Sequence, residues 1–186
     1  MTPENKSGAR IVVALMGLPG AGKSTVAKHL LAELPLHLVD RDRIRAALFP
    51  DCAFTQAEKD AANAAVLAAV AANCTLGRAS LVDGMTFARA TEVEALRACA
   101  AARNFDLLPL FLDCPVEVAR ARIAADRSHR AGDRTPALAD SVADRFEGPP
   151  ADAVQVAADA TAGEVCAAAL AAVRATLVRI GSEERT

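Results

Sequence analysis

The chain has 186 residues, a net charge of −2 and no Trp or Tyr. This length corresponds to one domain, and the slightly acidic balance provides no large basic field for a nucleic-acid backbone or an anionic membrane. Without Trp or Tyr, aromatic platforms that stack nucleic-acid bases are not expected either. Nucleic acid and membrane are therefore not the partners that this composition predicts.

The first half of the chain shows apolar runs that alternate with amphipathic stretches. We expect, in chain order, a strand over 11–16, a helix over 23–33, a strand over 36–39, a helix over 40–48 and a long alanine-rich helix from 55 to about 77. Proline residues after the first two helices mark their ends. Thr55 and Glu58 have the spacing of a capping box, which indicates where the long helix begins.

The second half continues the same alternation. We expect a strand over 80–82, a helix from about 91 to 103, a strand over 107–112, a helix opened by Pro115, a weak strand over 153–156 and a last helix over 161–180. Thr91 with Glu94, and Thr161 with Glu164, have capping-box spacing. Residues 126–141 are polar and rich in arginine, so they predict a loop or a mobile helical segment.

Strands that alternate with helices predict an α/β fold. We expect a three-layer α/β/α sandwich around a mostly parallel five-stranded sheet, because buried parallel strands are continuously apolar and are joined by helices. A single domain is expected over 10–180, between tails at 1–9 and 181–186. Ligands in such folds bind at the carboxyl ends of the strands, so the candidate site residues are sought there.

A phosphate-binding motif follows the first predicted strand. All four fixed positions of G-x-x-x-x-G-K-[ST] are present, between a strand and a helix, which indicates the P-loop NTPase fold. The motif comprises Gly17, Leu18, Pro19, Gly20, Ala21, Gly22, Lys23, Ser24 and Thr25. Its backbone N–H groups are expected to surround the β-phosphate of ATP, with Lys23 between the β- and γ-phosphates and the Ser24 hydroxyl on Mg²⁺.

Charged residues follow the second predicted strand in the order DRDRIR. Asp42 and Arg45 are at i,i+3 and share a helix face. Asp42 could orient an acceptor hydroxyl and take its proton, and Arg45 could hold an anionic group on the acceptor or the γ-phosphate. Asp40, nearest to the strand end, could hold a magnesium-bound water. The alternative is a solvated turn with ion pairs.

The third predicted strand ends at Asp83, which is followed by Gly84. Asp83 is expected in the metal shell or on the acceptor, and its alternative role is that of a turn or N-cap residue. Arg89 lies six residues later and could reach a phosphate or carboxylate of the acceptor, or else be an ordinary exposed arginine. Because Gly84 stands where many motor ATPases carry a second acidic residue, activation of water is not expected.

Five arginines lie close together after the fourth predicted strand, namely Arg120, Arg122, Arg127, Arg130 and Arg134. A lid over about 122–141 that supplies a guanidinium to the transferring group would have this composition. Arg127 is the predicted catalytic contact, and Arg122 is predicted to bind the nucleotide. The alternative is an ordinary charged helix in which Asp126 and Asp133 pair with these arginines.

These motifs together resemble the P-loop small-molecule kinase group of polynucleotide kinase-like, adenylylsulfate kinase-like and gluconate kinase-like proteins, over about residues 10–160. The resemblance rests on GLPGAGKST, the D-x-x-R of Asp42 to Arg45, LVDG at the third strand and PVEVARARIAADR. It implies that Asp42 is the general base and that Arg127 or Arg122 contacts the transferred phosphate. The segment 146–149 is similar to a short motif before the last strand of such proteins, and nothing in the sequence gives it a role.

The sequence therefore predicts an ATP-dependent kinase that transfers the γ-phosphoryl group to a hydroxyl of a small molecule, with ATP and Mg²⁺ as ligands. A polynucleotide 5′-hydroxyl or nucleotide kinase, and a nucleotide-binding regulatory or toxin-type module, remain as alternatives. The five cysteines are odd in number and form no CxxC pair, so a reducing cytoplasm is the expected compartment. The longest apolar run is about half a membrane span.

Overall fold

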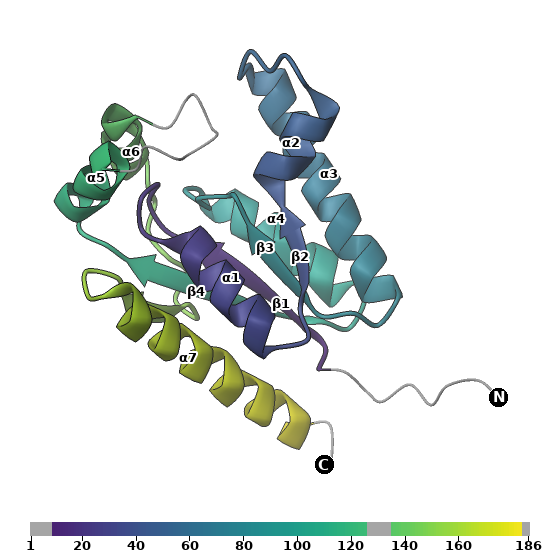
Figure 1. Ribbon diagram of the computed structural model, residues 1–186. Helices are drawn as coiled ribbons and strands as arrows, with labels where there is room; N and C mark the ends of the chain where they lie inside the picture. The colour runs from purple at the N-terminus through teal and green to yellow at the C-terminus, as the bar shows by residue number, and fades with distance from the viewer. Residues whose placement is uncertain (1–8, 126–134, 184–186) are drawn as a thin grey trace.

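The computed structural model describes residues 9–125 and 135–183, and these form one sheet with helices around it (Figure 1). The strands are β1 (Ile11–Met16), β2 (His37–Asp40), β3 (Ser80–Asp83), β4 (Asp106–Asp113) and β5 (Val154–Ala157). The helices are α1 (Lys23–Glu33), α2 (Arg41–Leu48), α3 (Gln56–Thr75), α4 (Ala90–Ala101), α5 (Val116–Ala125), α6 (Pro136–Ala143) and α7 (Ala162–Glu183). The strand order is β2-β3-β1-β4-β5 and every pairing is parallel, which confirms the predicted α/β fold.

The central strand β1 explains why its sequence is continuously apolar. All six of its residues are fully buried. Its alternate side chains enter two separate core clusters, Ile11, Val13 and Leu15 on one face and Val12, Ala14 and Met16 on the other. Helices α1 and α7 cover the first face, and α3 and α4 cover the second (Figure 1). Burial on both faces is typical of a parallel sheet between two helical layers.

Most predicted elements are confirmed, and β1 and α1 have the predicted bounds. The Thr55–Glu58 capping box is present at the start of α3. The Thr91–Glu94 capping box was wrong, because α4 begins at Ala90 and Thr91 lies inside it. The N–H of Arg89, which precedes the helix, donates to the carboxylate of Glu92 at 3.3 Å instead.

Helix α7 is longer than predicted, since it continues to Glu183 rather than ending at 180. It is also the one described helix that is long and apolar enough to cross a membrane by length and composition. Its inward side chains, including Val165, Ala169 and Val173, are buried in the core that β1 and α1 share. This packing accounts for the apolar character of α7 as that of a core helix in a globular domain.

Two helical pairs lie beyond the carboxyl ends of the strands. Helices α5 and α6 pack together at one end of this edge, and α2 with the start of α3 lies at the other (Figure 1). Helix α6 begins within the stretch 126–141 that was predicted as a loop or mobile helical segment, and it ends two residues beyond it. The rest of that stretch, 126–134, lies outside the described residues. The candidate site therefore lies along the edge between these pairs.

Candidate active site

The loop between β1 and α1 has a backbone that only glycine can follow at two points. Gly17 and Gly20 have φ values of +130° and +90°, in the region that favours glycine. A Cβ atom at Gly17 would lie 2.7 Å from the carbonyl oxygen of Leu112, and one at Gly20 would lie 2.4 Å from that of Ala119. The loop is therefore pressed against the end of β4 and against α5, which fixes the concave shape that phosphate binding requires.

The start of α1 is free to receive an anion. All residues of α1 are described, and its first turn contains no acidic side chain. The Lys23 ammonium group donates to the carbonyl oxygens of Gly17 and Leu18, at 2.8 and 2.9 Å, and so lies across the loop. Ser24 and Thr25 are exposed at the same turn. The positive end of the helix dipole, the lysine and these hydroxyl groups together favour a phosphate at this position.

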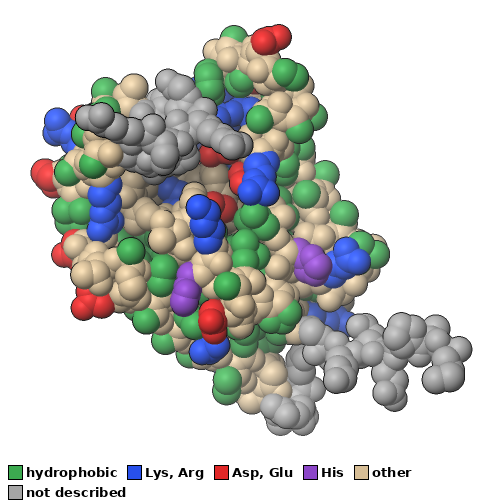
Figure 2. Space-filling view, viewed as in Figure 1, with side chains coloured by type: hydrophobic (Ala, Val, Ile, Leu, Met, Phe, Trp, Pro, Cys, Tyr) green, Lys and Arg blue, Asp and Glu red, His purple; other side chains and the backbone are tan. Residues whose placement is uncertain are grey.

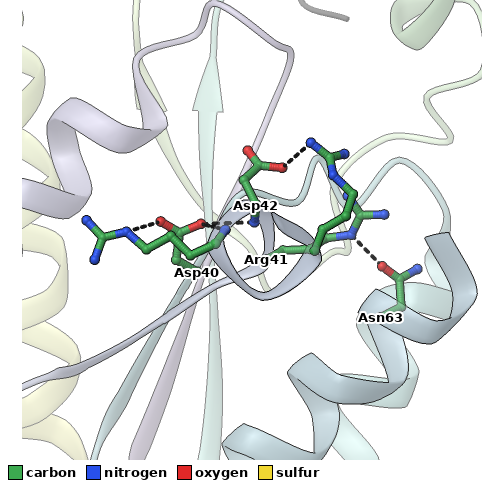
Figure 3. Close-up of polar contacts among 6 residues, drawn as sticks. Asp40, Arg41, Asp42 and Asn63 are labelled. Atoms are coloured by element: carbon green, nitrogen blue, oxygen red, sulfur yellow. Dashed lines mark hydrogen bonds and ion pairs between the residues drawn. The ribbon is translucent and has the colours of Figure 1, made fainter. Parts of the chain in front are cut away.

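Asp40 ends β2 and caps α2. Its carboxylate accepts the backbone N–H groups of Asp42 and Arg43, at 2.9 and 3.1 Å (Figure 3). The second carboxylate oxygen pairs with Arg43 at 3.2 Å. Both oxygens are thus used to begin α2 at this point, which sets the direction in which Asp42 and Arg45 project. The role of Asp40 in a magnesium shell stays a prediction.

Asp42 and Arg45 form the predicted pair. Their closest nitrogen and oxygen atoms are 3.2 Å apart, and the side chains are 47% and 11% exposed respectively. Arg45 also lies over the ring of Phe54, 4.7 Å from its centroid. A buried guanidinium therefore holds an accessible carboxylate. On the same side of α2, one turn before Arg45, the Nε of Arg41 donates to the Asn63 amide oxygen at 2.6 Å, which ties α2 to α3 (Figure 3).

Asp83 lies beside Asp40 at the ends of two paired strands. It is only 5% exposed, and its Oδ1 atom has no hydrogen-bond partner among the described residues. A buried carboxylate oxygen without a partner is costly, which points to a ligand that completes it. Magnesium prefers carboxylate, hydroxyl, phosphate and water oxygens, so Asp83 and Ser24 suit it. Within the described part of the chain no three His, Cys, Asp or Glu side chains form a metal-binding group, so phosphate and water would supply the other ligands.

Of the five arginines after β4, the structure describes two, Arg120 and Arg122. Arg122 donates to the carbonyl oxygens of Ala158 and Ala160, at 2.7 and 3.2 Å, so it joins α5 to the loop that follows β5. Arg120 pairs with Asp140 of α6 at 3.6 Å. Arg127, Arg130 and Arg134 lie outside the described residues. The predicted nucleotide contact of Arg122 and catalytic contact of Arg127 therefore stay predictions.

Burial raises the pKa of the thiol of Cys114, which lies just after β4 near Arg122. A protonated thiol is a poor nucleophile, so this cysteine has no feature of a covalent catalyst.

Arg89 is exposed at the start of α4. Figure 2 shows basic and acidic side chains gathered together in the middle of the face that carries the strand ends. The chemistry available there is charge stabilisation and proton transfer.

Sequence reasoning missed three contacts between residues near this site. Phe54 covers Arg45, Asn63 holds Arg41, and Glu147 binds the start of α4 at the backbone N–H of Ala90. The partners of Asn63 and Glu147 are 22 and 57 residues away along the chain, and the contact between Phe54 and Arg45 depends on how the turn after α2 folds back. For Glu147 the resemblance of 146–149 to a family motif was a signal, but it indicated no contact.

A parallel sheet with order 2-3-1-4-5 and a phosphate loop after β1 define a P-loop domain of the kinase-like kind. The chain belongs to the AAA domain family, whose model matches residues 12–149. A comparison with curated proteins gave no match.

Several solved structures share the fold. A gluconokinase from Sinorhizobium meliloti 1021 is 17% identical with a TM-score of 0.72, covering 95% of this chain and 97% of that one. The APS kinase CysC of Mycobacterium tuberculosis, in complex with AMPPNP and APS, is 20% identical with a TM-score of 0.64, covering 92% and 99%. A chain of the Pnkp1/Rnl/Hen1 RNA repair complex is 19% identical with a TM-score of 0.63, covering 79% of this chain and 47% of that one. The resemblance to the P-loop small-molecule kinase group is thus confirmed for the fold.

Proposed function

We propose that this protein is an ATP-dependent kinase that transfers the γ-phosphoryl group to a hydroxyl of a small-molecule acceptor. The observation that carries the proposal is the exposed carboxylate of Asp42, held by the buried Arg45 at the same sheet edge as the phosphate loop. A module that only senses a nucleotide needs no such carboxylate. Transfer to a bound hydroxyl needs a group that orients it and accepts its proton.

In this proposal the loop from Gly17 to Thr25 and Lys23 bind the phosphates of ATP. Mg²⁺, when bound, neutralises charge on the β- and γ-phosphates, and Ser24 with Asp83 or Asp40 would hold it. Asp42 takes the proton of the acceptor hydroxyl while that oxygen bonds to the γ-phosphorus. The bond from the γ-phosphorus to the β–γ bridging oxygen breaks, and ADP leaves.

The remaining predicted residues have supporting roles. Arg127 stabilises the transferring group and Arg122 supports the nucleotide. The contacts of Arg122 with the loop after β5 suit indirect support, since they fix backbone beside the cradle. Arg45 and Arg89 bind the acceptor, and Asp83 contacts either the acceptor or the metal. A cytoplasmic location goes with this role.

The activities for which the structural neighbours are named suggest acceptors with which to begin. A panel of gluconate, other sugar acids, polyols, APS, nucleosides and 5′-hydroxyl oligonucleotides would be tested for acceptor-dependent release of ADP from Mg·ATP. We expect a small hydroxylated molecule to support turnover that Asp42→Asn removes. Turnover on the oligonucleotides alone would favour the polynucleotide kinase alternative. Tight ATP binding with no acceptor-dependent turnover across the panel would favour the regulatory module.

A further inference from the structure

The segment 146–149 contacts the start of α4. The backbone N–H of Glu147 donates to the carbonyl oxygen of Ala88 at 2.9 Å, and its carboxylate accepts the backbone N–H of Ala90 at 2.8 Å. Ala90 is the first residue of α4, and the first N–H groups of a helix have no partner inside it. Glu147 therefore caps α4 from 57 residues further along the chain.

The chain between β3 and α4, residues 84–89, is here called the β3–α4 loop. It contacts both the start of α2, which carries Asp42, and the phosphate loop. A Cβ atom at Gly84 would lie 3.0 Å from the backbone nitrogen of Asp42 and 3.2 Å from that of Arg41. Two residues later, the carbonyl oxygen of Thr86 accepts the N–H of Gly17 at 3.3 Å. The loop thus lies against the start of α2 and against the first residue of the phosphate loop.

The β3–α4 loop has little freedom of its own. Met85, Phe87 and Ala88 are buried. Phe87 has a φ of +51°, a conformation that a bulky residue adopts only where its surroundings hold it. The bonds from Glu147 lie at the end of the loop where it leaves the core. The chain from that end back to Gly84 is therefore packed and conformationally constrained.

Glu147 is itself held firmly. After α6, the N–H groups of Arg145 and Phe146 each donate at 3.2 Å, to the carbonyl oxygens of Val142 and Ala143, so the chain turns tightly up to Glu147. The Phe146 ring stacks on Phe111 of β4, with 5.6 Å between centroids. The position of Glu147 is therefore set jointly by α6 and by the central part of the sheet.

We propose that Glu147 is a positioning residue that fixes the β3–α4 loop and, through it, Asp83 and Asp42 at the site. Asp83 immediately precedes the loop, and the backbone of Gly84 lies against that of Asp42. The effect on phosphoryl transfer rests on the function proposed above. The effect on the loop itself does not: it depends on the bond between the Glu147 carboxylate and the Ala90 N–H, since the backbone bond to Ala88 does not involve the side chain.

The test compares three full-length variants with the wild type. Glu147→Ala removes the bond to the Ala90 N–H, and Glu147→Gln keeps an oxygen that can accept it. Glu92→Ala is the matched control, because Glu92 accepts the N–H of Arg89 at the same helix start but has no link to α6. The measurements are deuterium uptake of residues 84–90, AMPPNP affinity with Mg²⁺, and kinetics with the acceptor that the panel identifies.

We expect Glu147→Ala to raise deuterium uptake across the whole β3–α4 loop, whereas Glu92→Ala raises it only at Arg89, the last residue of the loop, and in the first turn of α4. Displacement of catalytic groups by about 1 Å can cost roughly 10²-fold. Glu147→Ala should therefore lower kcat/KM for the acceptor by roughly 10- to 100-fold while AMPPNP affinity changes less than about twofold. Glu147→Gln should restore most of both properties.

Equal uptake and equal kinetics in Glu147→Ala and Glu92→Ala would overturn the proposal, because Glu147 would then be an ordinary helix cap. Unchanged uptake in Glu147→Ala would overturn it as well. If the panel yields no acceptor, the proposed kinase function fails, and the uptake comparison still decides whether Glu147 fixes the loop.

Discussion

Backbone shapes one side of the candidate site, and side chains shape the other. On the phosphate side, backbone makes the shape, since Gly17 and Gly20 lie against the carbonyl oxygens of Leu112 and Ala119. On the proposed acceptor side, side chains make it, through the pair of Asp42 and Arg45 and the ring of Phe54. Backbone geometry leaves little room for change, whereas a side-chain arrangement changes with one substitution. Such a domain can keep one donor and vary its acceptor.

The largest effect is expected on the phosphate side, from Lys23→Ala. Loss of a preorganised cation at the developing charge should lower turnover by roughly 10³-fold or more and weaken ATP binding. Lys28→Ala, an exposed lysine on the same helix, serves as the control. Turnover and calorimetric AMPPNP affinity would be measured on both. Normal turnover in Lys23→Ala would refute the role of the phosphate loop.

Arg127→Ala should slow transfer by about 10³-fold with little change in ATP affinity, because the predicted contact acts mainly in the transition state. Arg122→Ala is the comparison. Its guanidinium binds two carbonyl oxygens, so we expect a lower melting temperature and weaker nucleotide binding from it instead. Steady-state kinetics and thermal melts would separate the two. A larger catalytic loss in Arg122→Ala or Arg130→Ala would show that the wrong arginine was chosen.

Asp42→Asn tests the acceptor side, since it keeps the shape of the side chain and removes the base. It should cost roughly 10² to 10⁴ in kcat while the affinity for Mg·ATP barely changes. The contrast with Lys23→Ala, which alters both quantities, is the sharpest form of the comparison. If Asp42→Asn keeps full turnover, the base is to be sought at Asp83.

Asp40 should show a smaller effect that belongs to stability. Asp40→Ala removes the cap of α2 and should lower the free energy of unfolding by about 0.5–2 kcal/mol. Asp40→Asn keeps a good capping residue, so it isolates the predicted role in holding a magnesium-bound water, which would appear as a raised magnesium requirement. Urea unfolding and magnesium titration of activity measure the two effects. An unchanged magnesium requirement in Asp40→Asn would leave Asp40 as a helix cap alone.

The smallest effect compares two capping glutamates. The backbone N–H groups of Ala53 and Thr55 lower the pKa of Glu58, and the hydroxyl and N–H of Thr161 lower the pKa of Glu164. A lowered pKa in the folded state stabilises the fold above the unfolded pKa, and this stability is lost as the pH falls through the folded pKa. Glu58→Gln and Glu164→Gln should each give a flatter dependence of melting temperature on pH below about 4.5. An unchanged slope would mean that these bonds do not persist in solution.

The fold could be predicted from local patterns because its strands are short, apolar and separated by strong stop signals. The run over 11–16 and the P-loop fixed the central strand and the first helix, and the Thr55–Glu58 capping box fixed the start of α3. The start of α4 could not be predicted in this way. Its caps include a carboxylate from Glu147, and no local pattern distinguishes that start from one at Thr91.

The residues of the candidate site likewise divide into those that the sequence identified and those that it could not. The glycines, Lys23 and the D-x-x-R pair have fixed spacings, so the sequence identified them. It could not show that Arg45 is buried under Phe54 or that one oxygen of Asp83 has no partner, because both depend on packing between separate elements. The roles of Arg127 and Arg89 are still predictions, since Arg127 lies outside the described residues and Arg89 is an exposed residue at the start of α4.

The contacts that close the phosphate loop also set an order of events during synthesis. Gly17 and Gly20 leave the ribosome before the backbone that they rest against, which belongs to Leu112 and Ala119, nearly a hundred residues later. At about 5–20 residues per second, this interval lasts on the order of 5 to 20 seconds. For most of that interval neither β3 nor β4 has been synthesised, so the apolar strand β1 has no partner strand from either of them. The nascent chain is therefore exposed to aggregation and to chaperone binding before it can hold a nucleotide.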